Sequence, residues 1–473
     1  MTLAGALGFH MLSEQKLLAL RSFLGILPGG SATQLARMIE IDRLNDGTLP
    51  HDAILEFLRP ALRQYNNRVR VPSPIRYFCF PFEDLLFNGP RVVKRQAAIA
   101  RAVIQPLWHW LERDLLVPEM AEYMASFKAA VACEDTETCD ALAVDFWRLS
   151  GHAISEALNA DGALPAAFVN DAALVEDARE IATLLIGGQL VSEVRTLFPK
   201  PAPVPNEEKM TAFKAIHNAA ADTMPALVPY LPVVAMGRLE KPWQALRLVG
   251  RVTNRRTETM LAATDMGLAG ELLFGRMEDA LSVIRGMTQT DFDPDTLIDN
   301  LTEFTLLSGA IPKEIDILRS GAWGKRLLAN RATISAIMEG YMERALQDIA
   351  AAIPLKSSSV GAQTLVPHFG KVIADKNISR ACRYAKLLAG CRYLAGPAAF
   401  VVKYNEASNA SVDMLCFYNE AILNELRYPQ WPDRVQVERQ FTTAMEISRH
   451  LLGAEEASLL HRRGTIARET AEA

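Results

Sequence analysis

The segment Pro199–Pro205 constrains this fold more than any other stretch, because it carries a proline at every second position. Proline restricts φ and lacks a backbone N–H, so neither a helix nor a central strand continues through such a run. The pattern predicts an extended spacer over 199–206, between helical domains at 1–198 and 207–473. A second loop-like stretch, 354–370, marks a point where the C-terminal domain could divide.

Helical periodicity is the commonest signal on either side of this spacer. Apolar residues recur every three or four positions, as Leu142 and Phe146 do in 137–159 and Ile334 does in 325–350. Hydrophobic residues make up 50% of the chain and charged residues 22%, which is typical of a globular protein. The expected fold class is therefore all-α, with multi-helix bundles in two domains.

One stretch, 68–82, departs from the helical pattern because it alternates and is rich in proline and aromatic residues. The pattern predicts a short extended or β-like segment. Alternate side chains of an extended chain take opposite faces, so some of the aromatic rings would be exposed and could form a docking surface. The alternative is a strap that fills grooves of the first domain. The candidate residues are Tyr77, Phe78, Phe80 and Phe82.

Four arginines form the other candidate binding feature. Arg247, Arg251 and Arg255 follow one another at intervals of four, and Arg256 is adjacent. If 240–256 is helical, they make a basic stripe that could bind phosphate or carboxylate groups. The alternative is a solvated or internally paired face.

Catalytic and metal-binding patterns are weak. Three histidine–carboxylate pairs have helical spacing: His109 with Glu112, His152 with Glu156, and Glu446 with His450. None falls on the apolar stripe of its helix, so we expect no metal site, and no cofactor or catalytic residue is predicted. Asp291–Asp295 has part of the spacing of a calcium loop but lacks the required glycine. Asp293 and Pro294 instead predict a helix start.

Charge and cysteine content limit the environment and the partners. The net charge is −5, with 12 basic and 8 acidic residues in 1–100, 7 and 16 in 101–200, and 31 of each in the remainder. This balance disfavours nucleic acid. The six cysteines form no CxxC pair, which favours reduced thiols. No basic residue precedes the apolar N-terminus and no apolar run is long enough to span a membrane, so a cytoplasmic location is expected.

These observations lead to two functional hypotheses. The first is a cytoplasmic interaction or scaffold protein that binds another protein or a second copy of the chain. The alternative is an enzyme or small-ligand-binding protein, with an anion held by the arginine cluster between the two domains. The absence of a catalytic motif leaves enzymatic activity open and weighs against it.

Overall fold

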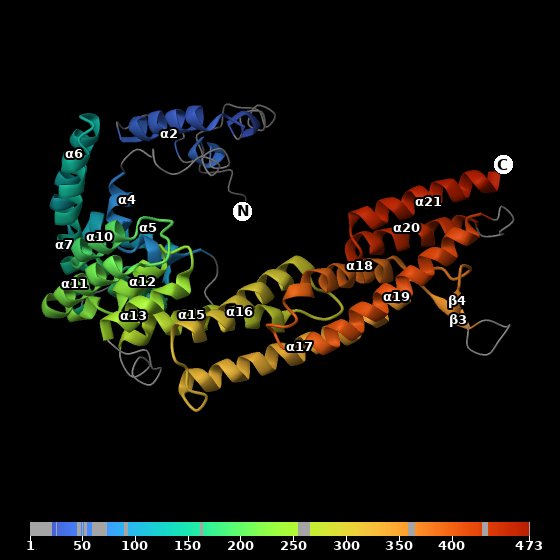
Figure 1. The fold of residues 1–473 in the computed structure, drawn as a ribbon. Coiled ribbons are helices and arrows are strands. Elements are labelled where there is room, and N and C mark those ends of the chain that lie inside the picture. The colour runs from blue at the N-terminus through green and yellow to red at the C-terminus, as the bar shows by residue number, and fades with distance from the viewer. Residues whose placement is uncertain are drawn as a thin grey trace. The chain divides into compact units, whose positions relative to one another are not determined.

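The computed structural model describes residues 21–24, 26–44, 49, 51, 54–58, 73–88, 93–160, 164–253, 265–357, 365–427 and 434–472. These residues are mostly helical (Figure 1), which confirms the all-α fold class. The chain divides into two compact units. The first unit comprises residues 1–202 and 212–240, and the second comprises residues 203–211 and 241–473. The domains predicted from the sequence, 1–198 and 207–473, are parts that would fold independently. Compact units do not test this property, so the predicted boundary stays a prediction.

The first unit contains helices and one pair of very short strands. Its helices are α2 (Gly29–Leu44), α4 (Pro74–Cys79), α5 (Ile104–Trp110), α6 (Val117–Ala132), α7 (Thr136–Asn159), α8 (Ala166–Val169), α9 (Ala172–Ile186), α10 (Gly188–Leu197) and α12 (Tyr230–Met236). Single turns of 3₁₀ or π helix lie at Glu83–Leu85, Arg101–Val103, Leu111–Leu115 and Pro225–Leu227. Strands β1 (Leu86–Phe87) and β2 (Ile99–Ala100) pair in parallel, with Leu86 opposite Ile99.

The core of the first unit forms where α7 packs along α9 and α6. The helix predicted over 137–159 is confirmed, and Phe146 is buried and stacks on Tyr123 with ring centres 4.0 Å apart. Leu142 is only half-buried, because the buried face of α7 turns toward Trp147 and its neighbours. The N-cap is Asp135, whose side chain accepts from the backbone of the first turn.

The extended segment expected near 68–82 is wrong for its described part. Residues Pro74–Cys79 form α4, and the carbonyl of Ser73 accepts a hydrogen bond from the Tyr77 N–H at 3.0 Å. Pro74 occupies the first position of this helix, where proline is well tolerated, so its presence does not exclude a helix. Phe78 and Phe82, four residues apart, are both fully buried, which fits a helical turn rather than alternation. Residues 68–72 lie outside the described residues.

The proline-rich segment is extended, but it is attached to neighbouring chain. The Ala202 N–H donates to the Arg238 carbonyl and the Glu240 N–H donates to the Ala202 carbonyl, both at 2.9 Å. Ala202 is fully buried, and the Lys200–Pro201 peptide bond is cis. The prolines therefore exclude helix here, while the backbone groups at Ala202 still find partners.

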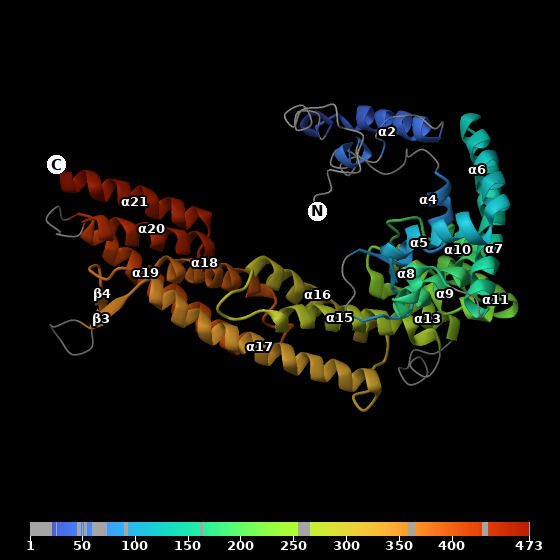
Figure 2. The same ribbon diagram turned by 180° about the vertical axis from the view of Figure 1, so that it is seen from behind.

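The second unit is an array of longer helices (Figure 2). Its helices are α13 (Ala245–Thr253), α15 (Leu268–Gly286), α16 (Pro294–Glu314), α17 (Ala322–Ala352), α18 (Asp375–Gly390), α19 (Val401–Glu425), α20 (Arg434–Leu451) and α21 (Ala454–Glu472). Turns of 3₁₀ helix lie at Pro242–Gln244, Asp265–Gly267 and Cys391–Tyr393. Strands β3 (Leu355–Ser357) and β4 (Leu365–Pro367) pair antiparallel between α17 and α18. Helix α11 (Glu207–Thr223) begins in the second unit and ends in the first.

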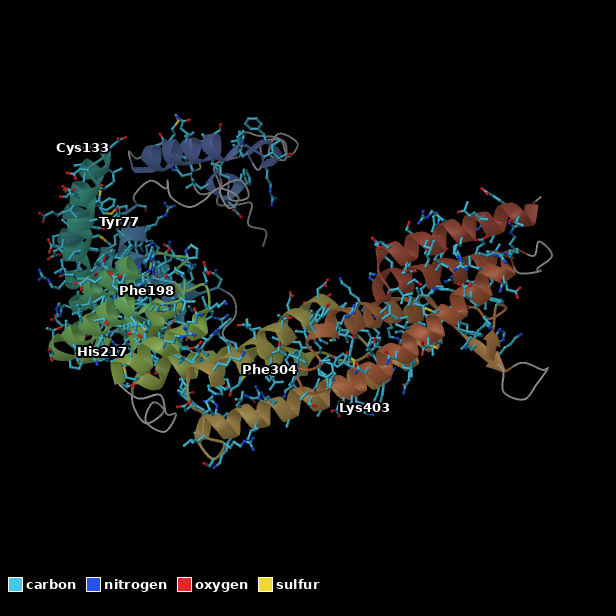
Figure 3. All side chains as sticks on the ribbon, viewed as in Figure 1. Tyr77, Cys133, Phe198, His217, Phe304 and Lys403 are labelled. Carbon is cyan, nitrogen blue, oxygen red and sulfur yellow. The ribbon has the colours of Figure 1, made fainter. Side chains whose placement is uncertain are left out.

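Helix α18 lies at the centre of this array and packs against α16, α17 and α20. Tyr384 of α18 packs on Phe292 with ring centres 5.0 Å apart, and Tyr341 of α17 completes the aromatic cluster. Helix α17 also packs along α19, where Lys403 pairs with Glu343 at 3.3 Å (Figure 3). The helix predicted over 325–350 is thus confirmed as part of α17.

Helix α16 has a defined start and an unusual last turn. Its start confirms the predicted cap, because the Asp293 carboxylate accepts from the Thr296 N–H at 2.9 Å. Pro312 lies inside the helix and has no N–H to donate to the carbonyl of Ser308. That carbonyl instead accepts from the guanidinium of Arg331 in α17 at 2.6 Å.

Candidate functional site

Helix α13 places Arg247 and Arg251 on one exposed face. Ala245 and Val249 on the other side of the helix are buried. This division follows from the helical period, since residues four apart lie one above the other. The structure therefore confirms a helix within 240–256 and the common face of these two arginines.

Arg247 forms a bidentate pair with Glu314, the last residue of α16. Its Nε donates to Oε2 at 2.6 Å and its Nη2 donates to Oε1 at 3.0 Å. The Glu314 side chain is only 8% exposed. These hydrogen bonds raise the pKa of Arg247 above its ordinary value. Bidentate pairs are the strongest of this kind, and removal of Arg247 would leave a buried carboxylate without a counter-ion.

Arg251 forms a looser pair with Glu207, the first residue of α11. The Arg251 Nη2 lies 3.3 Å from the Glu207 carboxylate, and the two side chains are 44% and 75% exposed. Asn206 caps α11 by accepting from the Lys209 N–H at 2.9 Å, so Glu207 is not needed as the cap. An exposed pair of this kind contributes little to stability.

These side chains surround a cavity of about 530 Å³, a size suited to a small molecule. Its described lining residues are Pro205, Glu207, Met210, Leu246, Arg247, Gly250, Arg251, Lys313 and Glu314. All of them belong to the second unit. Its apolar lining residues are Pro205, Met210 and Leu246, and its charged lining residues are Glu207, Arg247, Arg251, Lys313 and Glu314. No described carboxylate pairs with Lys313.

The described lining of this cavity contains none of the other predicted site residues. Arg255 and Arg256 lie outside the described residues. The four predicted aromatic residues, Tyr77, Phe78, Phe80 and Phe82, belong to the first unit. Two of them are fully buried and two are half-buried, so most of their surface is covered by the core. This burial fits a core role better than an exposed docking surface.

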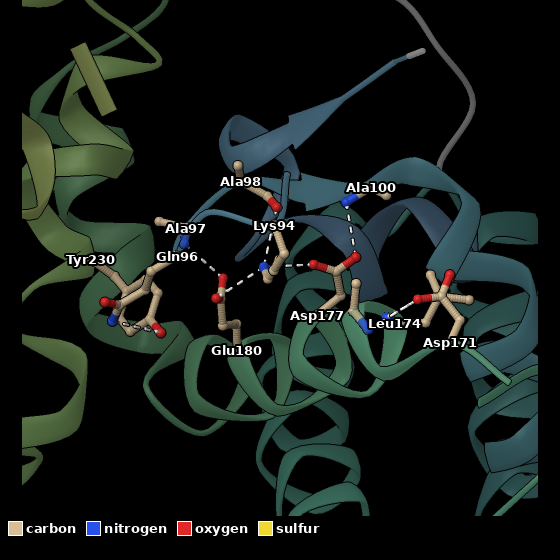
Figure 4. Close-up of polar contacts among 11 residues, drawn as sticks. Lys94, Gln96, Ala97, Ala98, Ala100, Asp171, Leu174, Asp177, Glu180 and Tyr230 are labelled. Atoms are coloured by element: carbon tan, nitrogen blue, oxygen red, sulfur yellow. Dashed lines mark hydrogen bonds and ion pairs between the residues drawn. The ribbon is translucent and has the colours of Figure 1, made fainter. Parts of the chain in front are cut away.

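The first unit contains a buried ionic cluster that the sequence analysis missed. The Lys94 ammonium lies 2.7 Å from Asp177 and 3.0 Å from Glu180, and it also donates to the carbonyl of Ala98 (Figure 4). Asp177 is fully buried, and Glu180 accepts from the N–H of Ala97 at 2.8 Å. The cluster thereby attaches the chain before β2 to helix α9.

Burial also perturbs the ionisation of Glu180. Removal from water raises the pKa of this carboxyl, and the Lys94 ammonium and the Ala97 N–H oppose the shift only in part. Ala97 itself has φ +61°, in the left-handed region that a non-glycine residue seldom adopts. The strained backbone of Ala97 and the buried carboxylate of Glu180 are thus joined by one hydrogen bond.

A second buried cluster surrounds Asp84, whose side chain is 4% exposed. The guanidiniums of Arg195 and Arg238 lie 3.3 and 3.0 Å from its carboxylate. Both arginines also donate to backbone carbonyls, those of Phe80 and Phe198. Each charge has partners, so the arrangement fits a structural joint rather than an open site.

The histidine–carboxylate pairs do not assemble a metal centre in the described residues. His109, His152 and Glu446 are exposed, and within the described ranges no three metal-ligating side chains come together. The six cysteines are all free thiols. Among the described segments, no helix has both the length and the apolar character to cross a membrane.

His217 of α11 is a buried titratable group that no sequence pattern indicated (Figure 3). Burial lowers the pKa of His217, and the neighbouring Asn218 opposes this shift to a smaller extent. By geometric criteria neither ring nitrogen makes a hydrogen bond, so burial is the dominant cause of the shift. Burial therefore favours the neutral form of the imidazole.

Comparison with known proteins provides no further guide, because no family model, curated protein or solved structure matches the chain.

Proposed function

We propose that the second unit binds a small anionic ligand in the cavity between α13, the start of α11 and the end of α16. The observation that carries the proposal is the convergence of Arg247, Arg251 and Lys313 on a single cavity. Guanidinium and ammonium groups recognise carboxylate and phosphate groups through charge-assisted hydrogen bonds. The apolar part of the lining would cover the rest of the ligand.

The pairing of both arginines limits what such a site can bind. Three cationic and two anionic side chains line the cavity. The lining therefore offers one net positive charge, which suits a single anionic group better than a polyphosphate. This balance also reduces the attraction for the nucleic-acid backbone.

A calorimetric titration tests the proposal. The full chain would be titrated with acetate, octanoate, citrate, inorganic phosphate and pyrophosphate. We expect at least one to bind saturably, and Arg251→Ala to weaken binding about tenfold or more, since a charge-assisted contact is lost. Arg276→Ala is the matched control, because Arg276 is 48% exposed and pairs with Glu303 away from the cavity. Binding by none of these anions, or equal binding by Arg251→Ala, would refute the proposal.

A second candidate function is protein binding, which retains the scaffold hypothesis. It is favoured by exposed apolar side chains in the second unit, where Tyr393 is 81% and Val402 is 66% exposed. Large exposed aromatic and aliphatic groups are typical of contact surfaces.

Sedimentation velocity over a range of protein concentrations tests whether the partner is a second copy of the chain. We expect a faster-sedimenting species at high concentration, and its loss when Tyr393→Glu and Val402→Glu are combined. A chain that stays monomeric throughout would contradict self-association.

A further inference from the structure

We infer that Glu207 is an internal competitor for the ligand: its carboxylate occupies the position on Arg251 that the ligand's anionic group takes. The inference rests on the proposed function and assigns the site a ligand class, an amphipathic acid with one negative charge. Three observations carry it: the unequal strength of the two arginine pairs, the placement of Glu207, and the composition of the cavity lining.

The two arginines differ in how readily they exchange partners. Arg247 makes two hydrogen bonds to Glu314, whose side chain is 8% exposed. A ligand that displaced Glu314 would leave a buried carboxylate without its counter-ion, which is costly. Arg251 makes one contact at 3.3 Å with a carboxylate that is 75% exposed. Water can solvate that carboxylate when it leaves, so Arg251 is the arginine that exchanges.

Glu207 is suited to leave, because the start of α11 does not depend on it. The cap of this helix is the side chain of Asn206, which bonds to the N–H of Lys209. A carboxylate in the first turn gains only a small stabilisation from the helix dipole when it is exposed, so little is lost if its side chain moves. Rotation of Glu207 away from Arg251 therefore leaves the helix intact and opens the cation to the cavity.

The lining then determines the ligand class. With Glu207 turned away, the anionic group meets Arg251 and Lys313, while Arg247 stays with Glu314. Buried Leu246 and Pro205, together with half-buried Met210, form the apolar part. An acid with a hydrocarbon body can contact both the cations and these apolar residues, whereas a small or multiply charged anion contacts the cations alone.

The test is a calorimetric titration of the full-length wild type, Glu207→Gln and Glu208→Gln with sodium octanoate. Glu208 is the matched control, because it is exposed, adjacent in sequence and not part of the lining. Loss of the competing charge corresponds to at most about 1 kcal/mol, so we expect Glu207→Gln to bind octanoate roughly two- to fivefold more tightly. We expect Glu208→Gln to match the wild type and acetate to bind much more weakly than octanoate. Thermal unfolding of each variant confirms that it is folded.

The outcomes separate the inference from the proposed function. If wild type binds octanoate but Glu207→Gln binds it equally or less tightly, the competitor role is refuted and the binding site remains. If citrate or phosphate binds and octanoate does not, the amphipathic ligand class is refuted. If none of the anions binds any variant, the proposed function fails, and the inference fails with it.

Discussion

The cluster around Lys94 and the Arg251–Glu207 pair at the cavity use the same kinds of charged groups in different surroundings. The Lys94 ammonium is 13% exposed and holds two carboxylates that are nearly or fully covered. At the cavity, Arg251 and Glu207 are largely in solvent. The free energy of a broken pair depends on whether water can replace the lost partner. The Lys94 cluster is therefore expected to hold structure, and the Arg251–Glu207 pair is expected to exchange partners.

The largest expected effect is at the buried cluster. Lys94→Ala would leave Asp177 and Glu180 buried without a cation, and we expect it to lower the free energy of unfolding by about 3 to 5 kcal/mol. Chemical denaturation monitored by circular dichroism measures this. Lys386→Ala removes an exposed pair with Asp295 and should cost less than about 1 kcal/mol. Equal losses in the two variants would show that burial does not distinguish them.

Arg247 should fall between these extremes. Arg247→Ala leaves the nearly buried carboxylate of Glu314 without its two hydrogen bonds, so we expect a loss of about 1 to 2 kcal/mol. Glu314→Gln keeps an acceptor for Arg247 and should cost less. The same denaturation assay measures both variants. If Arg247→Ala left the free energy of unfolding unchanged, Arg247 would be as exchangeable as Arg251, and the two arginines would not differ.

The pH dependence of stability at Glu180 gives a further test of how buried and exposed charged groups differ. Its pKa is raised in the folded state above the ordinary value of 4.5, mainly by burial. The associated stability is present below about pH 4.5 and is lost as the pH rises through the folded pKa. Glutamine stays neutral, so Glu180→Gln should gain stability relative to wild type as the pH rises from about 4.5 upward. Urea denaturation at intervals across this range measures the gain. Glu208→Gln is the exposed control, and a difference independent of pH would contradict the assignment.

The smallest expected effect is at the exposed pair. Arg251→Ala should change the free energy of unfolding by less than about 1 kcal/mol, because both side chains are open to water. The same variant should lose ligand binding, so stability and binding separate at this residue. Thermal unfolding beside the titration gives both quantities. A large loss of stability would instead make Arg251 a structural residue.

Local sequence patterns predicted the helices better than their contacts. The helix start at Asp293 follows from its capping side chain, and the common face of Arg247 and Arg251 follows from their spacing. The extended structure predicted for residues 74–79 is wrong, because alternating aromatic residues and prolines fit either an extended segment or a short helix.

The partners of the charged groups could not be predicted from the sequence. Glu314 lies 67 residues from Arg247, and Asp177 lies 83 residues from Lys94. Such pairs are created by the packing of helices that are distant in the chain, and no local spacing encodes them. The same holds for the cavity lining, which combines three separate segments.

The proline in the last turn of α16 has a consequence for how helices of the second unit align. It leaves the Ser308 carbonyl open to Arg331, a directional bond from one particular residue of α17. A helix held only by apolar contact could slip by a turn and repack, but this bond would break if it did. The missing hydrogen bond in α16 thus fixes the position of α17 along it. The fixed point lies within the last two turns of α16, close to Glu314 and its pair with Arg247.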